Sequence, residues 1–329
     1  MGGKHLLVTT VKDEGPFILE WVAWHRLAGF DPILVYQNGS TDLTQRSLRV
    51  MDQHGLIQYI PNDHGRSSPQ IRAYTRASEH PAFTDAEWCL ALDGDEFFVS
   101  HVGRGTVAEL TEHIGSADAM LINWRNFGSA GQREMSDALV TERFTQTVER
   151  QLVARHLVGF KSLFRTSAFS RIGIHNARFP RKENLVAVNG SGLSDGHFER
   201  LNWRCKDPGG MALAQINHYP IKDAASFLLK TLRGRGHQND YSEWERYWRR
   251  FDHNQVRDLT LAGRVSHILA EMQRMDEVSN GRLGLIRRKS LRIWQTKIAE
   301  ALSHPQTRDL YDRILAMIQP PDLAATEPR

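Results

Sequence analysis

An acidic turn that follows an apolar stretch is the part of the chain best suited to chemistry. The run 88–92 is apolar, is typical of a buried strand, and leads directly into Asp93-Gly94-Asp95. Two carboxylates on either side of a glycine suit a hard divalent cation that keeps coordination sites for water and phosphate oxygens. The pattern therefore predicts metal-assisted chemistry on a phosphorylated substrate. The alternative is a simple Asp-Gly turn or helix cap.

Length and composition limit the classes of protein to consider. The chain has 329 residues, of which 40% are hydrophobic, enough for one large core or a core domain plus a smaller helical one. The net charge of +4 and the pI of about 9.1 suit a protein that handles phosphates. No nucleic-acid-binding motif or concentrated basic stripe accompanies this charge, so we expect no nucleic-acid partner.

Cysteine usage and hydropathy indicate the compartment. Cys89 and Cys205 are the only cysteines, and they can build neither a disulfide framework nor a zinc cluster. No apolar run approaches the length of a membrane span, and the amino terminus lacks the apolar region of a signal peptide. We therefore expect a cytoplasmic protein.

Strands and helices are expected to alternate along the first 130 residues. Strands are predicted at 6–11, 33–36, 56–60, 88–92 and 119–124, with helices at 16–29, 69–80 and 107–114 and another that ends near residue 54. This alternation predicts an α/β fold with a mostly parallel sheet flanked by helices. Residues 126–132 are expected to form a loop over the site, and short strands and turns are expected from 161 to 198. The chain is predicted to be helical from about residue 226, with a domain boundary near residue 235 and a disordered tail over 320–329.

Six further segments stand out in order along the chain: Lys12-Asp13-Glu14-Gly15, Glu20-Trp21-Val22-Ala23-Trp24-His25, Asn38-Gly39-Ser40-Thr41-Asp42, Asn123-Trp124-Arg125-Asn126-Phe127-Gly128, Gly159-Phe160-Lys161-Ser162-Leu163-Phe164-Arg165 and Asn217-His218-Tyr219. Together with the acidic turn, they resemble the GT-A glycosyltransferases of the family 2 type, especially the branch related to family 92 (DUF23-like). The resemblance covers roughly residues 5 to 240. It implies a GT-A (Rossmann-like) fold, with residues 1–235 as the nucleotide-sugar-binding and catalytic domain. Residues 236–319, which the residue pattern predicts to be a helical C-terminal region, carry little of the resemblance.

The resemblance also implies a reaction and a cofactor. A sugar would pass from a nucleotide-sugar, expected to carry uridine diphosphate, to a hydroxyl of a glycan or glycolipid, with Mn²⁺ or Mg²⁺ at the acidic motif. A cation there would stabilise the charge that develops on the leaving diphosphate. Asp95 is the first expected ligand, while Asp93 would bind through water or hold the ribose. His218 is the third expected ligand, and its alternative is a hydrogen-bonded histidine in a strand.

Other polar residues are expected around the donor. Glu14 and Asp42 fall at the ends of the first two strands and could hold the base and ribose, with helix capping as the alternative, and Asn38 belongs to the same set. Arg125 sits at a strand end and is expected to contact donor or acceptor. Six basic residues are candidates for clamping the diphosphate. We expect about two of them to touch substrate and the others to be solvated. The six are Lys161, Arg165, Lys222, Lys230, Arg233 and Arg235, of which Lys161 and Arg233 are favoured.

The catalytic base is the least defined part of the site. An inverting transferase needs a carboxylate or histidine to take the acceptor proton, whereas a retaining enzyme does not need that placement. Glu96 follows the metal motif, while Asp195 and His197 belong to a polar cluster farther along the chain. We favour Asp195 or His197 slightly over Glu96, and loop capping is the alternative for all three.

Two aromatic or amphipathic patterns occur in the helical end of the chain. The predicted helix near Arg287 and Leu302 has an apolar face and a basic face, so it could lie peripherally on the inner face of a membrane. Packing against its own domain is the favoured interpretation. Four aromatic residues recur at helical spacing and could stack sugar rings, although a core stripe is favoured. They are Trp244, Tyr247, Trp248 and Phe251.

Two rival functions remain. One is a non-catalytic nucleotide-sugar or glycan-binding module, against which the intact acidic motif argues. The other is a nucleotidyltransferase that makes a sugar nucleotide. That class normally begins with a glycine-rich phosphate loop, which the segment 12–15 does not provide. The metal-dependent glycosyltransferase, in a setting of bacterial glycan or glycolipid assembly, is therefore the preferred hypothesis.

Overall fold

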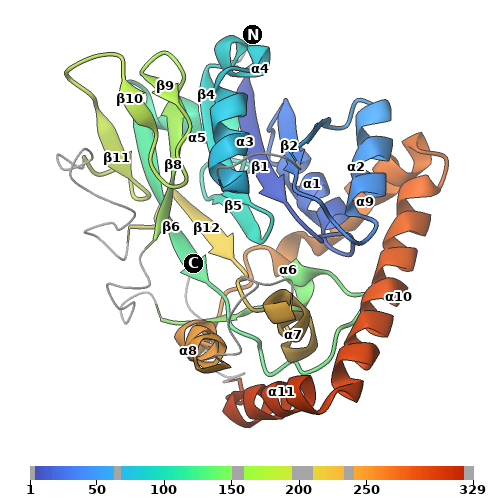
Figure 1. Cartoon of the computed structure of the whole chain (residues 1–329). Coiled ribbons are helices and arrows are strands. Elements are labelled where there is room, and N and C mark those ends of the chain that lie inside the picture. Colours follow the sequence, from blue (N-terminus) through green and yellow to red (C-terminus); the bar gives the residue numbers. More distant parts are fainter. Residues whose placement is uncertain (1–3, 63–67, 150–158, 195–209, 233–240, 322–329) are drawn as a thin grey trace.

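A computed structural model describes residues 4–62, 68–149, 159–194, 210–232 and 241–321 (Figure 1). Asp195, His197, Arg233 and Arg235 lie outside these residues, as does most of the expected C-terminal tail. Within the described part, nine strands form one sheet in the order β3-β2-β1-β4-β8-β6-β12-β5, with β11 paired to β6. Five of the eight pairings in this sheet are parallel, so the predicted α/β fold with a mostly parallel sheet is confirmed.

The first half of the sheet is entirely parallel. Its strands are β1 (His5–Val11), β2 (Ile33–Gln37), β3 (Gln58–Pro61) and β4 (Trp88–Asp93). Nearly every residue of β1, β2 and β4 is buried, as expected for strands covered by helices on both faces. The crossover segments contain α1 (Ile18–Leu27), α2 (Thr44–Gln53), α3 (Pro69–Ser78) and α4 (Pro81–Asp85).

The second half of the sheet mixes directions. Its strands are β5 (Glu96–Ser100), β6 (Ala119–Asn126), β8 (Phe160–Arg165), β11 (Ala187–Asn189) and β12 (Ala214–His218). The strand β8 runs antiparallel between β4 and β6, and β5 runs antiparallel to β12. The sequence predicted β6 and the short strands after 159, but not β5 as a separate strand. The reason is that its apolar residues directly follow the acidic turn and appear continuous with β4.

Smaller elements complete this part of the chain. The helix α5 (Val107–Ile114) has the predicted bounds and begins with a capping box formed by Thr106 and Glu109. The other small elements are α6 (Val140–Arg143), β7 (Gln146–Thr147), β9 (Phe169–Arg171), β10 (Arg178–Pro180) and β13 (Val256–Arg257).

The helical end of the chain packs against the α/β part. Its elements are α7 (Ala224–Leu232), α8 (Tyr241–Phe251), the 3₁₀ helix η4 (Ala262–Arg264), α9 (Val265–Val278), α10 (Arg282–Ser303) and α11 (Pro305–Met317). The helix α9 packs on α1, α10 on α2 and α7, and α11 on α7 and α8. Figure 1 shows α10 running along one side of the molecule, with α11 crossing beneath it. One hydrophobic core therefore contains residues of both parts, such as Trp21 and Ile268.

The apolar face of α10 contacts the protein itself. Leu291, Trp294 and Ile298 are 7%, 2% and 9% exposed, while the basic residues Arg288 and Arg292 face outward. The expected membrane contact through this face gains no support, because its apolar side chains are already buried. Among the described helices, none combines the length and the apolar composition that a bilayer crossing requires.

The helix α10 also holds two loops at the end of the sheet. The indole Nε1 of Trp294 donates a hydrogen bond to Asp42 Oδ2 at 3.0 Å, and the same oxygen accepts one from the backbone N–H of Gly15. The Phe17 ring meets the Trp294 ring edge-on at 5.2 Å. Asp42 and Trp294 together therefore join the loops after β1 and β2 to the C-terminal helix.

We expect Trp294→Phe to lower the free energy of unfolding by about 2 kcal/mol. The substitution keeps an aromatic ring against Phe17 but removes the hydrogen bond to the Asp42 carboxylate. Urea denaturation would measure the change. Arg292→Gln, on the exposed face of the same helix, is the control and should stay within about 0.5 kcal/mol of wild type. Equal stability of Trp294→Phe and wild type would contradict the proposed anchoring.

A buried histidine joins α1 to β5. His25 is fully buried; its Nδ1–H donates to the carbonyl of Trp21 at 2.8 Å, and its Nε2 accepts from the backbone N–H of Phe98 at 3.2 Å. Burial lowers the pKa of His25 to about 3, against which the hydrogen bond to Trp21 acts only partly. The imidazole therefore stays neutral in the folded protein at every pH near neutrality.

This depressed pKa predicts a loss of stability in mild acid. Below the ordinary histidine pKa of about 6.5, His25 is protonated in the unfolded chain but stays neutral in the folded protein. The contribution is present above pH 6.5 and is lost progressively as pH falls toward the folded-state pKa. Between pH 6.5 and 5, His25→Gln should lose about 1–2 kcal/mol less stability than wild type does. Urea denaturation at both pH values tests this, with exposed His267→Gln as control. An unchanged pH dependence in His25→Gln would show the idea to be wrong.

Candidate active site

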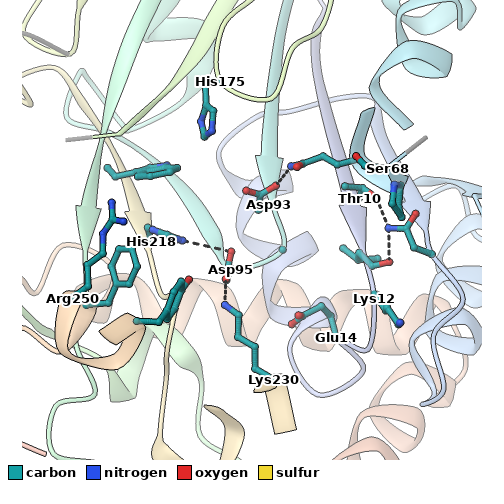
Figure 2. Close-up of a pocket in the computed structure, with 18 residues that line it drawn as sticks. Thr10, Lys12, Glu14, Ser68, Asp93, Asp95, His175, His218, Lys230 and Arg250 are labelled. Atoms are coloured by element: carbon teal, nitrogen blue, oxygen red, sulfur yellow. Dashed lines mark hydrogen bonds and ion pairs between the residues drawn. The ribbon is translucent and has the colours of Figure 1, made fainter. Parts of the chain in front are cut away.

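A pocket opens at the carboxyl ends of β1 and β4, where the sheet changes its direction of winding (Figure 2). The connections after β1 lead outward to β2 and β3, whereas β4 is followed by the other half of the sheet, and open α/β sheets bind ligands at such a point. The pocket has a volume of about 630 Å³, and we call it the sheet-edge pocket. It is lined by Thr10, Val11, Lys12, Glu14, Asn38, Ser68, Pro69, Gln70, Asp93, Gly94, Asp95, Trp124, His175, His218, Lys230, Tyr247, Arg250 and Phe251.

The acidic turn forms the floor of this pocket. Asp93 is the last residue of β4, and Gly94 and Asp95 connect it to β5. A Cβ atom on Gly94 would lie 3.2 Å from Val11 Cγ1 and 3.4 Å from Glu14 Cγ, tighter than most real contacts. Glycine therefore lets the turn lie against the end of β1, which brings Asp93 and Asp95 to the middle of Figure 2.

The ammonium group of buried Lys161 contacts Asp93 from the interior of the protein. Asp93 Oδ2 lies 3.0 Å from the Nζ of Lys161, and its Oδ1 accepts a hydrogen bond from Gln70 Nε2 at 2.6 Å. Lys161 is fully buried and also lies 3.3 Å from Glu96 Oε2. Burial lowers the pKa of Lys161, but Asp93 and Glu96 outweigh it and hold that pKa above its usual range. Lys161 therefore remains charged and neutralises Asp93.

Glu96 lies beneath the turn, where it accepts the backbone N–H of Asp93 at 2.8 Å. Its side chain is fully buried, and burial raises its pKa well above the usual range, although the Lys161 charge opposes this. Glu96 does not line the sheet-edge pocket. Its position is that of a support for the turn.

Asp95 faces an imidazole and an ammonium group. Its Oδ2 lies 3.1 Å from Lys230 Nζ, and its Oδ1 lies 3.9 Å from His218 Nε2. Burial raises the pKa of Asp95, but the charges of Lys230, of His218 when acid protonates its ring, and of Lys222 outweigh burial and hold the pKa below its usual range. Asp95 is therefore ionised.

The tautomer of His218 is set by Asn126. An amide oxygen can only accept, so the contact of 2.9 Å between His218 Nδ1 and Asn126 Oδ1 places the proton on Nδ1. Burial lowers the pKa of His218 to about 4, so the ring is neutral near pH 7. The lone pair of Nε2 thus faces Asp95 Oδ1. Two electron-pair donors, a nitrogen and a carboxylate oxygen, therefore lie opposite each other at the pocket floor.

This arrangement fits a divalent cation. Carboxylate oxygen and neutral imidazole nitrogen form a donor set that Mn²⁺ accepts, and an outer partner such as Asn126 commonly orients a ligating histidine. Among the described residues, no three His, Cys, Asp or Glu side chains are already gathered closely enough to hold a metal. Gln70 and Lys161 already contact the two carboxylate oxygens of Asp93. Asp95 and His218 would therefore hold the ion directly, and Asp93 fits a contact through water.

The structure brings several predicted donor residues to the pocket. Glu14 and Asn38 line it, and Asn38 Nδ2 donates to the Val11 carbonyl at 3.3 Å. Lys222 lies nearby, with its Nζ 4.6 Å from the centre of the Phe17 ring, and it lines a small adjoining cavity. Asp42 is placed behind the loop, since its carboxylate binds Gly15 N, Thr44 N and the Trp294 indole.

Two predicted arginines do not reach the pocket. Arg125 is 1% exposed, and its Nε lies 3.6 Å from Asp258 Oδ2. Arg165 lies at the end of β8 that is opposite the start of β4, away from the acidic turn, where it pairs with Glu87 and covers the Trp88 ring at 4.3 Å. Asp195, His197 and Arg233 lie outside the described residues.

Sequence reasoning missed several lining residues. Gln70 follows the proline at which α3 begins, so the predicted helix start was an available signal. His175 lies in a turn between β9 and β10 and carried no local signal. Burial, together with the Lys161 charge, lowers the pKa of His175 to about 4, and its Nδ1–H donates to the Phe160 carbonyl at 3.3 Å.

Solved structures give weak overall similarity. Residues 1–349 of S. aureus TarS in complex with UDP are 12% identical, with 91% of each chain covered and a TM-score of 0.34. Another TarS structure is 14% identical over 50% of this chain, with a TM-score of 0.30, and the match spans only 29% of the TarS chain. Glucosyl-3-phosphoglycerate synthase from Mycobacterium tuberculosis, solved with Mn²⁺, UDP and glucosyl-3-phosphoglycerate, is 17% identical. That match covers 38% of this chain and 45% of the synthase, with a TM-score of 0.26.

A family model gives a more extensive match. None of the curated proteins matches the chain. The model described as glycosyltransferase family 92 matches residues 11–244, which include the end of β1, the acidic turn and His218. Because this match covers well over half of the sequence, the chain belongs to glycosyltransferase family 92 and is a transferase enzyme.

Proposed function

We propose that this enzyme uses a divalent metal to transfer a sugar from a nucleotide-sugar, with uridine diphosphate as the carrier, to a hydroxyl of a glycan or glycolipid. The observation that supports this most directly is the confrontation of Asp95 Oδ1 and His218 Nε2, 3.9 Å apart at the pocket floor. Two electron-pair donors held this way favour a cation between them. The volume of about 630 Å³ also falls within the range typical of small-molecule sites.

The polar side of the pocket suits the nucleotide. Thr10, Lys12 and Ser68 lie on the side opposite His218 and Arg250 in Figure 2, at the end of β1 and beside α3. Asn38 adds an amide at the end of β2. Hydroxyl and amide groups of this kind can bind a base and a ribose, while the cationic Lys12 can meet a phosphate. A donor held here would direct its diphosphate toward Asp95.

The protein contributes charge and positioning to bond cleavage. When bound, a divalent cation neutralises charge that grows on the leaving diphosphate. Lys230 is placed to add a second positive charge, because its Nζ lies 3.1 Å from Asp95 Oδ2. Burial lowers the pKa of Lys230, but Tyr247 and Asp95 outweigh burial and hold that pKa above its usual range. Lys161 keeps Asp93 in place from beneath the floor, and Asn126 keeps the Nε2 lone pair of His218 directed into the pocket.

We expect uridine diphosphate to stabilise the wild-type protein only when Mn²⁺ is present. At a ligand concentration one hundred times the dissociation constant, binding adds about 2.7 kcal/mol to the free energy of unfolding. Asp95→Ala should lose this gain because it removes the carboxylate that faces His218. Thermal-shift measurements with uridine, guanosine, adenosine and cytidine diphosphates, with Mn²⁺ or with EDTA, would check both expectations.

Asp312→Ala is the matched control, since it removes an exposed carboxylate from α11, away from the pocket. It should respond to uridine diphosphate and Mn²⁺ as wild type does. If no nucleotide diphosphate stabilises wild type with any metal, the proposed donor is wrong. If nucleotide and metal bind but a UDP-sugar is neither hydrolysed nor transferred, the protein is a binding module.

A further inference from the structure

The sheet-edge pocket has two chemically different sides. One consists of the hydroxyl, amide and ammonium groups that we assign to the nucleotide. The other presents aromatic rings, and we call Trp124, Tyr247 and Phe251 the aromatic wall. Trp124 belongs to β6, whereas Tyr247 and Phe251 come from α8. A ligand that spans the pocket would therefore contact polar groups at one end and aromatic rings at the other.

The aromatic wall is continuous with the candidate metal ligand. The Trp124 ring lies 4.8 Å from the His218 ring and 5.4 Å from the His175 ring. Phe251 lies 5.8 Å from His218, and Tyr247 lies 4.8 Å from Phe251. The wall thus begins beside the point where the bond to the leaving group would break and extends away from the nucleotide side.

The aromatic residues of α8 divide into two groups. Trp248 is fully buried and packs on Phe227 at 5.1 Å, and Trp244 contacts the same ring at 6.1 Å. These two residues belong to the core stripe that the sequence favoured. Tyr247 and Phe251 belong to the same core stripe and also line the pocket: Phe251 is 5% exposed, and Tyr247 stacks on Phe227 at an interplanar angle of 16°. Packing of the first group therefore fixes the rings of the second.

The position of this wall in the chain is informative. The family match ends at residue 244, before Tyr247 and Phe251, whereas it includes the acidic turn and His218. The parts expected to serve every donor of the family therefore lie inside the match. The α8 side of the wall lies beyond the matched residues.

We propose that the aromatic wall binds a pyranose ring of the acceptor glycan and that Tyr247 is a specificity-determining residue for that acceptor. This inference rests on the function proposed above. A pyranose has one face of C–H groups and an edge of hydroxyls, so an aromatic ring can bury the face while polar groups meet the edge. His175 borders the wall and supplies such a polar group. An acyl chain has no hydroxyl groups with which a polar side chain could form hydrogen bonds, and for this reason we assign the wall to a sugar ring.

Ligand-observed saturation-transfer NMR tests this assignment on the full chain loaded with uridine diphosphate and Mn²⁺. The probes are methyl β-D-galactopyranoside, methyl β-D-glucopyranoside and octyl β-D-glucopyranoside. We expect saturation of ring C–H protons in the wild-type protein, including those of the octyl glucoside. Tyr247→Leu should weaken binding of the methyl glycosides about two- to tenfold, the range of one aromatic contact. Tyr247→Phe should keep the wild-type affinity because it retains the ring.

Arg249→Leu is the matched control, since it introduces the same leucine at an exposed position of the same helix that does not line the pocket. It should bind the probes as wild type does. Saturation confined to the octyl chain, absence of saturation in wild type, or equal binding by Tyr247→Leu and wild type would each overturn the proposal. The thermal shift with uridine diphosphate and Mn²⁺ is recorded on every sample. If that shift persists while the sugar probes fail, the acceptor wall is wrong and the donor site stands. If the shift itself is missing from wild type, the proposed function fails first.

Discussion

The site depends on the compensation of three acidic residues crowded into one turn. Asp93, Asp95 and Glu96 follow one another at the end of a buried strand, where like charges would repel and burial would favour their neutral forms. Lys161 approaches from inside the sheet and neutralises Asp93, and Glu96 lies within 3.3 Å of the same ammonium group. Lys230 approaches Asp95 from the pocket side. Two lysines on opposite sides of the turn therefore bring positive charge to two of its carboxylates.

The pairing of β8 with β4 explains why Lys161 can do this. Leu163 of β8 lies opposite Leu90 of β4 in an antiparallel register, so Lys161, two residues earlier, falls near the end of β4. Arg165 lies four residues farther along β8, which is about 13 Å away in an extended strand. The two basic residues share a strand and a face, but only one of them can reach the acidic turn. The length of β8 therefore explains why Lys161 reaches the site and Arg165, predicted for the same role, does not.

The sequence predicted those parts of the site that depend on local order. Asp93, Asp95, Glu14 and Asn38 follow apolar strands, and parallel strands bring their carboxyl ends to the same edge, so their meeting could be expected. The other parts of the site depend on pairing between strands that are far apart in the sequence. His218 reaches Asp95 because β12 pairs with both β5 and β6. No local pattern reveals this, and the prediction of His218 came from the family resemblance.

Burial of charged residues was equally hidden from local reasoning. A basic residue at a strand end can face a ligand or an internal acid, and the sequence around Arg125 does not distinguish these cases. In the structure, Asp258 lies 3.6 Å from the Arg125 guanidinium although 133 positions separate the two residues, and both are buried. Asp42 illustrates the same point, because its carboxylate is engaged by a helix that begins 240 positions later. Tertiary partners of this kind decide whether a polar side chain is structural.

The C-terminal helices are therefore part of the site in two distinct ways. Through Trp294, α10 holds the loops after β1 and β2, and these loops supply Lys12, Glu14 and Asn38 to the polar side of the pocket. Through Tyr247 and Phe251, α8 supplies part of the opposite side. The helix α8 also affects the acidic turn, because the Tyr247 ring centre lies 5.6 Å from Lys230 Nζ, which in turn lies 3.1 Å from Asp95 Oδ2. A substitution that removes this ring therefore changes the surroundings of the acidic turn as well as the aromatic side of the pocket.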